Sequence, residues 1–118
     1  RCIALDVGLT GDIPSVDKRD FPCRLGAGPT VVYSDGSVSY SWRFADDLVA
    51  TARANDIPVQ QAAFQQYGSD GAEVFRRGAA TALVTYPTRY THSPAETVDE
   101  RDIEACVDLL VAYATVQP

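Results

Sequence analysis

Two residues of this chain could bind a metal ion, one histidine and one aspartate. His92 is the only histidine among the 118 residues and lies in the polar segment 86–94. Asp6 lies within the apolar run 2–7. A neutral imidazole and a carboxylate are ligands that zinc and cobalt accept. Because two ligands do not complete such a site, these residues predict only part of a metal centre.

The elements that would position these residues follow from the hydrophobic pattern. Short apolar or β-branched runs predict strands, and apolar residues at a spacing of three to four predict helices. The pattern predicts strands at residues 2–7, 30–33, 59–65 and 80–86. It predicts helices at residues 41–55, between Asp70 and Gly78, and from residue 97 onward. The stretch from Thr10 to Pro29 is rich in glycine and proline and predicts a long loop.

The three expected helices carry specific features of capping and packing. Asp70 and Glu73 have the spacing of a capping box, and Gly78 is suited to end that helix. In helix 41–55, the apolar face is expected to place Trp42 in the core or against a partner. In the last helix we expect the acidic positions from Asp99 to Asp108 to cap the helix and face solvent. The face expected to dock on the sheet consists of Ile103, Cys106, Val107 and Leu110.

The alternation of strands and helices predicts a three-layer α/β/α sandwich with a mostly parallel sheet, formed by residues 1–118 as a single unit. Ligands of such sheets gather where loops leave the carboxyl ends of the strands. Asp6, the segment Gly68–Asp70 and His92 all fall at such ends. They are therefore expected to converge on one crevice, although an isolated histidine more often plays a surface or structural role.

Composition excludes several classes of function and partner. The net charge of −6 and the single lysine, Lys18, disfavour a nucleic-acid partner. No apolar run approaches the roughly 20 residues of a membrane span, so no membrane partner is expected. Three separated cysteines predict reduced thiols and a cytoplasmic location. The chain opens at Arg1 and enters a strand at once, so we expect a piece of a longer protein.

A series of short motifs extends over nearly the whole chain and resembles one enzyme family. Each motif is weak alone, but their order and approximate spacing resemble those of the M42 metallo-aminopeptidases. This family includes glutamyl and tetrahedral aminopeptidases, and some members are labelled endoglucanases. The motifs are Leu5-Asp6-Val7, Gly11-Asp12-Ile13-Pro14, Leu25-Gly26-Ala27-Gly28-Pro29, Gly68-Ser69-Asp70, Pro87-Thr88-Arg89-Tyr90-Thr91-His92-Ser93-Pro94 and Val98-Asp99-Glu100-Arg101-Asp102.

The resemblance implies a site with two divalent metal ions, zinc or cobalt, that hydrolyses N-terminal residues of peptide substrates. By resemblance, Asp6 is a ligand of one metal and His92 a ligand of the other. Gly68, Ser69 and Asp70 resemble a Gly-Thr-Asp segment near the substrate pocket, with serine in place of threonine. Relatives often have glycines just before this segment, where the present chain has Gln65-Gln66-Tyr67. Arg89 either contacts substrate or orients its loop through a carboxylate.

The remaining members of the family's site have no counterpart in this chain. One histidine, the bridging aspartate, one glutamate ligand and the general-base glutamate would all precede residue 1. The inserted β-domain through which relatives form homo-oligomers is missing as well. The resemblance therefore implies the C-terminal part of a metallopeptidase catalytic domain. We expect this chain by itself to be inactive, to bind metal weakly at best, and to self-associate through exposed edges and apolar patches.

Two other interpretations remain open at the level of sequence. The chain could be a non-catalytic α/β remnant or assembly module that has kept the fold after losing the active site. It could also be a glycoside hydrolase, which requires two carboxylic groups on either side of a sugar bond. Asp6 and Asp12 are candidates for that pair, but nothing in the sequence places them suitably.

Overall fold

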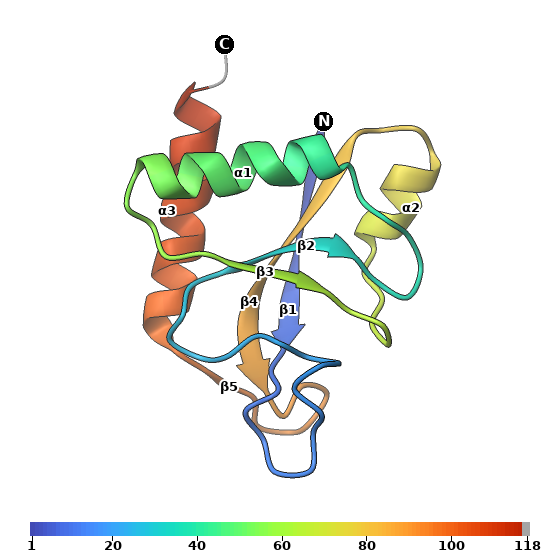
Figure 1. The fold of residues 1–118 in the computed structure, drawn as a ribbon, viewed down its shortest axis with the longest axis vertical. Helices are drawn as coiled ribbons and strands as arrows, with labels where there is room; N and C mark the ends of the chain where they lie inside the picture. The colour runs from blue at the N-terminus through green and yellow to red at the C-terminus, as the bar shows by residue number, and fades with distance from the viewer. Residues whose placement is uncertain (117–118) are drawn as a thin grey trace.

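The structure is a computed structural model in which residues 1–116 are described, and they form an α/β unit (Figure 1). A sheet runs through its middle, with α1 and α3 packed together on one face. The strands are β1 (Cys2–Leu9), β2 (Thr30–Ser34), β3 (Gln60–Ala63), β4 (Thr81–Arg89) and β5 (Thr97–Val98), and the helices are α1 (Trp42–Ala54), α2 (Gly71–Arg76) and α3 (Glu100–Val116).

The sheet has the order β1-β4-β2-β3, and β5 pairs with the end of β4. Strand β1 is parallel to β4 along its whole length, from Cys2 opposite Thr81 to Leu9 opposite Thr88. Strands β2 and β3 are also parallel, whereas β2 and β5 are antiparallel to β4. The sheet is therefore mixed. The predicted α/β class is confirmed, and the carboxyl ends of β1 and β4 lie together, as the candidate site requires.

Alternation along the central strands sends side chains into two separate cores. Val31 and Val84 face α1 and α3, where they pack with residues such as Leu48 and Leu109. Their neighbours Val32 and Leu83 face the opposite side and pack with residues that include Phe64 and Tyr40. Because successive strand residues point to opposite faces, near-continuous apolar runs fill both cores. Strands β2 and β4 are therefore buried on both faces.

Strand β1 is less buried than its apolar sequence predicts. It lies at the edge of the sheet, and β4 is its only strand partner within residues 1–116. The Leu5 side chain is therefore 55% exposed, although the neighbouring Ile3 packs against the core. An edge strand with an open backbone is a site to which another strand can add.

The last helix docks on the sheet through a face that differs from the expected one. Cys106 is buried as predicted, but Ile103 and Val107 are exposed and Leu110 is only partly buried. The buried face consists of Asp102, Ala105, Cys106, Leu109 and Tyr113. Two apolar stripes share this helix, so spacing alone does not determine which one packs.

Asp102 explains the choice of face and corrects the expectation that the acidic residues of this helix are solvated. Its side chain is only 1% exposed. One carboxylate oxygen accepts a hydrogen bond from the Gly26 amide at 2.8 Å and the other from the Gly28 amide at 2.7 Å. A buried carboxylate needs such donors. Asp99, by contrast, caps the helix as predicted, with the Arg101 amide 3.0 Å from its Oδ1.

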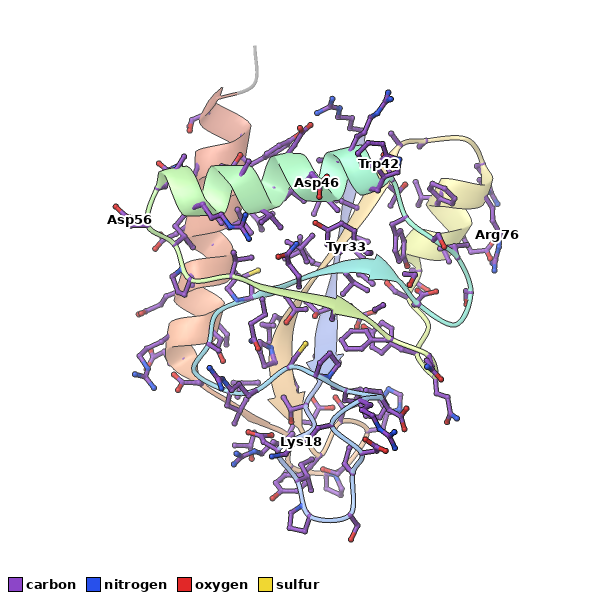
Figure 2. The ribbon with its side chains drawn as sticks, viewed as in Figure 1. Lys18, Tyr33, Trp42, Asp46, Asp56 and Arg76 are labelled. Atoms are coloured by element: carbon purple, nitrogen blue, oxygen red, sulfur yellow. The ribbon has the colours of Figure 1, made fainter. Side chains whose placement is uncertain are left out.

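Trp42 is not a core residue. It lies at the first position of α1, and its side chain is 60% exposed at that end of the helix (Figure 2). The Arg43 guanidinium stacks over its ring at 5.1 Å. The buried residues of α1 are Phe44, Ala45, Leu48, Val49 and Ala52.

The predicted capping box of α2 is not formed. Asp70 is the N-cap residue but makes no side-chain capping bond, and Glu73 pairs with Arg76 instead. Asp70 has helical backbone angles, which differ from the extended conformation typical of capping aspartates. The hydroxyl oxygen of Ser69 instead accepts a hydrogen bond from the Gly71 amide at 3.3 Å. Gly78 follows the helix at a φ of +90°, as expected of a C-terminal glycine.

No helix within residues 1–116 has the length and apolar character of a membrane span.

Candidate metal and substrate site

Asp6, Gly68 and His92 line one cavity of about 440 Å³, together with Val7, Leu9, Gln66, Tyr67 and Thr91. The three residues come from β1, from the segment before α2 and from the loop after β4. Asp6 and His92 are 86 positions apart in the sequence. The fold brings them together because β1 and β4 are parallel and their carboxyl ends lie side by side. The expected convergence of these loops is confirmed for Gly68, but the structure does not place Ser69 or Asp70 in the cavity wall.

Asp6 is held at the cavity by its place in β1. It pairs in register with Thr85 of β4, so the neighbouring strand fixes its backbone. Its Oδ1 accepts a hydrogen bond from the Val7 amide at 2.8 Å. The side chain is partly buried, which is the environment in which a carboxylate benefits from a cation or further donors. Asp6 is therefore available to the cavity and held in a defined orientation.

His92 lies on an exposed loop with an unusual backbone. His92 has a φ of +63° and Tyr90 a φ of +62°, a conformation that residues other than glycine adopt infrequently. The His92 amide donates to the Glu96 carboxylate at 2.9 Å, which ties the loop to itself. Strained backbone of this kind is often found where a side chain must be aimed at a ligand. The imidazole side chain is exposed and can bind a ligand from solvent or from another segment.

Tyr67 contributes to the cavity and was not among the predicted site residues. Its hydroxyl donates to the Val7 carbonyl oxygen at 2.7 Å, directly after Asp6. Burial, followed by the negative charge of Asp6, raises the pKa of Tyr67 well above its ordinary value. The phenol therefore keeps its proton and acts as a donor. Its position beside the Gly68 motif was the only sequence signal for it.

Arg89 lies at the end of β4 and does not line the cavity. Its Nε donates to Asp12 Oδ1 at 3.1 Å and its Nη2 to Asp12 Oδ2 at 2.6 Å. The Arg89 guanidinium lowers the pKa of the Asp12 carboxyl to about 2. Of the two roles considered for Arg89, the structure supports that of orienting a loop, since the pair ties the long loop after β1 to β4. The same pairing makes Asp12 unsuitable as a glycosidase acid.

The donor set for a metal is partial in this chain. Asp6 and His92 supply two of the ligand types that zinc accepts, and both line the same cavity. Within residues 1–116, however, no three His, Cys, Asp or Glu side chains come close enough together to hold an ion. The residues present therefore fit metal ions only as part of a site that other residues complete.

Comparison with known proteins assigns the family. The profile of the M42 glutamyl aminopeptidases matches residues 1–109 of the chain. The chain belongs to the M42 family. The resemblance inferred from the motifs is thereby confirmed, and the motif residues 68–70 and 87–94 lie inside the matched range.

Individual M42 relatives agree with this assignment. A lysyl aminopeptidase from Pyrococcus furiosus is 30% identical over 114 residues, which are 91% of this chain and 32% of that protein. The structure of an aminopeptidase from the archaeon Desulfurococcus kamchatkensis is 31% identical, with a TM-score of 0.88, covering 94% of this chain and 32% of that one. The TET1 peptidase of Pyrococcus horikoshii is 27% identical, with a TM-score of 0.79, over 95% and 32% of the respective chains.

The match is nearly complete for this chain but partial for its M42 relatives. The chain spans about a third of the length of these proteins. The fold is therefore shared over the matched third.

Proposed function

We propose that this chain is part of a metal-dependent aminopeptidase, which removes N-terminal residues from peptides with two divalent metal ions, zinc or cobalt. Asp6 would be a ligand of one ion and His92 a ligand of the other. The observation that carries the proposal is that Asp6, His92 and Gly68 line the same cavity. M42 membership supports the reaction class.

Each residue of the cavity has a definite task in this proposal. Bound metal ions would polarise the scissile carbonyl and lower the pKa of a water molecule. Asp6 presents an oriented carboxylate from β1, and the loop after β4 presents His92 at the cavity that Gly68 also lines. Gly68 lies in the cavity wall, against which a peptide N-terminus would bind. The general base and the remaining ligands would come from outside these 118 residues.

The other proposed substrate residues act at different distances from the cavity. Ser69 and Asp70 lie at the start of α2, next to Gly68, where they would shape the approach of the peptide. Arg89 would act indirectly, because its guanidinium is paired with Asp12 and holds the loop that follows β1. Its neighbours Thr91 and His92 do line the cavity.

The ligand assignment is tested by zinc binding to the 118-residue chain. The single histidine gives one set of imidazole proton signals, so NMR reads His92 without ambiguity. Zinc should bind weakly and shift those signals together with the carboxyl-carbon signal of Asp6, which is identified by its absence from the spectrum of Asp6→Ala. Zinc binding measured by equilibrium dialysis should be weaker in His92→Ala and in Asp6→Ala than in the wild type. Asp46→Ala serves as a control, because Asp46 is an exposed residue of α1. Zinc titrations that leave the wild-type signals of Asp6 and His92 unmoved would refute the assignment.

Activity gives a second and separate test. The chain alone should not release the chromophore from aminoacyl substrates, because too few ligands are present for two ions. Chelator-sensitive release by the isolated chain would contradict this expectation.

We also propose a cytoplasmic location, supported by free thiols at Cys2, Cys23 and Cys106. Homo-oligomers are proposed from the P. horikoshii relative, whose structure is described as a tetrahedron or a large octahedral shell.

A non-catalytic remnant or assembly module is the second candidate. The partial donor set favours it, since a chain that keeps the fold but not the ligands would present this picture. The parent reading frame distinguishes the two candidates. An upstream segment with a His-x-Asp motif and a Glu-Glu pair supports the peptidase, and a start codon at this position supports the remnant.

A further inference from the structure

Tyr67 contacts the backbone that carries the proposed ligand Asp6. Its hydroxyl donates to the carbonyl oxygen of Val7, and the amide of the same Val7 donates to Asp6 Oδ1. Val7 is thus held by hydrogen bonds through both its carbonyl and its amide. A change at the carbonyl is transmitted to the carboxylate through one residue of a strand.

The Tyr67 side chain is itself firmly placed. Its ring packs on Phe64 with centroids 5.0 Å apart, and Phe64 is buried in the core. The Tyr67 carbonyl accepts the Gly36 amide at 2.9 Å, so the backbone of this segment is anchored on its other side. A hydroxyl on a ring held in this way has little freedom to leave its partner.

We propose that Tyr67 is a positioning residue that fixes the Asp6 carboxylate for metal binding by holding the Val7 carbonyl. This inference rests on the proposed function, because it takes Asp6 as a ligand. It adds a role for a tyrosine that occupies a stretch described above as glycine-rich in many relatives. Groups that orient a metal ligand typically change metal affinity 10–100-fold when they are removed.

The test removes only the hydroxyl, with Tyr67→Phe in the 118-residue chain. Zinc is titrated while NMR follows the Asp6 carboxyl carbon and the His92 imidazole protons separately. We expect the zinc affinity measured at Asp6 to fall about tenfold. The affinity measured at His92 should stay within about twofold of wild type, because His92 lies on a different loop. General loosening of the chain would weaken both affinities together.

Tyr33→Phe is the matched control for loss of a tyrosine hydroxyl. Tyr33 donates to the carboxylate of Asp46 at 2.6 Å on the α1 side of the sheet, away from the cavity (Figure 2). This variant should bind zinc as the wild type does at both positions. If Tyr33→Phe and Tyr67→Phe weakened binding equally, the positioning role would be refuted.

The remaining outcomes separate this inference from the proposed function. Suppose that zinc shifts the Asp6 carboxyl signal in the wild type and that Tyr67→Phe binds zinc at Asp6 with unchanged affinity. That result would overturn only the role of Tyr67. Zinc that never shifts Asp6 in the wild type would overturn the ligand assignment, and the positioning role with it. An equal loss of zinc affinity at Asp6 and His92 in Tyr67→Phe would also overturn the positioning role, because the substitution would then have loosened the whole chain.

Discussion

The Asp12–Arg89 pair should make the stability of the chain depend on pH in acid. Two hydrogen bonds join these side chains, at 3.1 and 2.6 Å, and the pKa of Asp12 falls from 3.8 to about 2. At about 1.4 kcal/mol per pH unit, this difference corresponds to at most about 2.5 kcal/mol. Asp12 is 25% exposed and Arg89 34%, so screening by water and salt reduces the contribution to about 1–1.5 kcal/mol.

The direction of the effect follows from the lowered pKa. Ionised Asp12 stabilises the fold above its unfolded pKa of 3.8, and this stabilisation is lost as pH falls through about 2. Asp12→Asn removes the charge at nearly constant shape. It should lower the free energy of unfolding by about 1 kcal/mol at pH 7, and the difference from wild type should shrink between pH 5 and pH 2.

Urea unfolding at several pH values measures this difference directly. Asp17→Asn is the matched control, because Asp17 also pairs with an arginine but the partner, Arg19, is 89% exposed. That variant should be indistinguishable from wild type. The reasoning fails if Asp12→Asn keeps a constant difference from wild type down to pH 2, or if Asp17→Asn is equally destabilised.

Three further pairs of variants test the packing, each by urea unfolding. Asp102→Ala should cost about 3 kcal/mol, because the Gly26 and Gly28 amides lose a buried charged acceptor, whereas Asp108→Ala on the exposed face should change little. Leu109→Ala should cost about 3 kcal/mol and Val107→Ala less than about 0.5, and equal losses would mean that α3 packs through the other stripe. Gly28→Ala should cost more than Gly78→Ala: both have a φ near +90°, but only at Gly28 would a Cβ collide with the Pro58 backbone.

The sequence predicted the main frame of this molecule because strong local signals agreed with the fold. Asp6 and His92 could be placed in one region because the carboxyl ends of parallel strands share an edge of the sheet, and β1 and β4 are parallel. The helix end at Gly78 was predictable because only few residues tolerate its backbone angles.

The features that escaped prediction depend on partners far away in the sequence. Asp102 finds its donors at Gly26 and Gly28, more than 70 residues earlier, and this pairing selects the buried face of α3. Tyr67 finds a main-chain carbonyl 60 residues away, which leaves no mark in a motif. The exposure of Trp42, at the first position of α1, likewise leaves no local mark in the sequence. Local periodicity carries no information on such contacts.

The pairing of β1 with β4 also determines the order in which the chain can fold. Cys2 meets Thr81, so β1 has to wait for about 80 further residues before its partner is synthesised. Contacts of such long sequence separation slow folding and prolong the exposure of unpaired strands. On the ribosome, the apolar β1 segment therefore emerges well before the strand that pairs with it. Chaperone binding during synthesis should concentrate on residues 2–9, well before the proposed ligand Asp6 reaches its place beside the cavity.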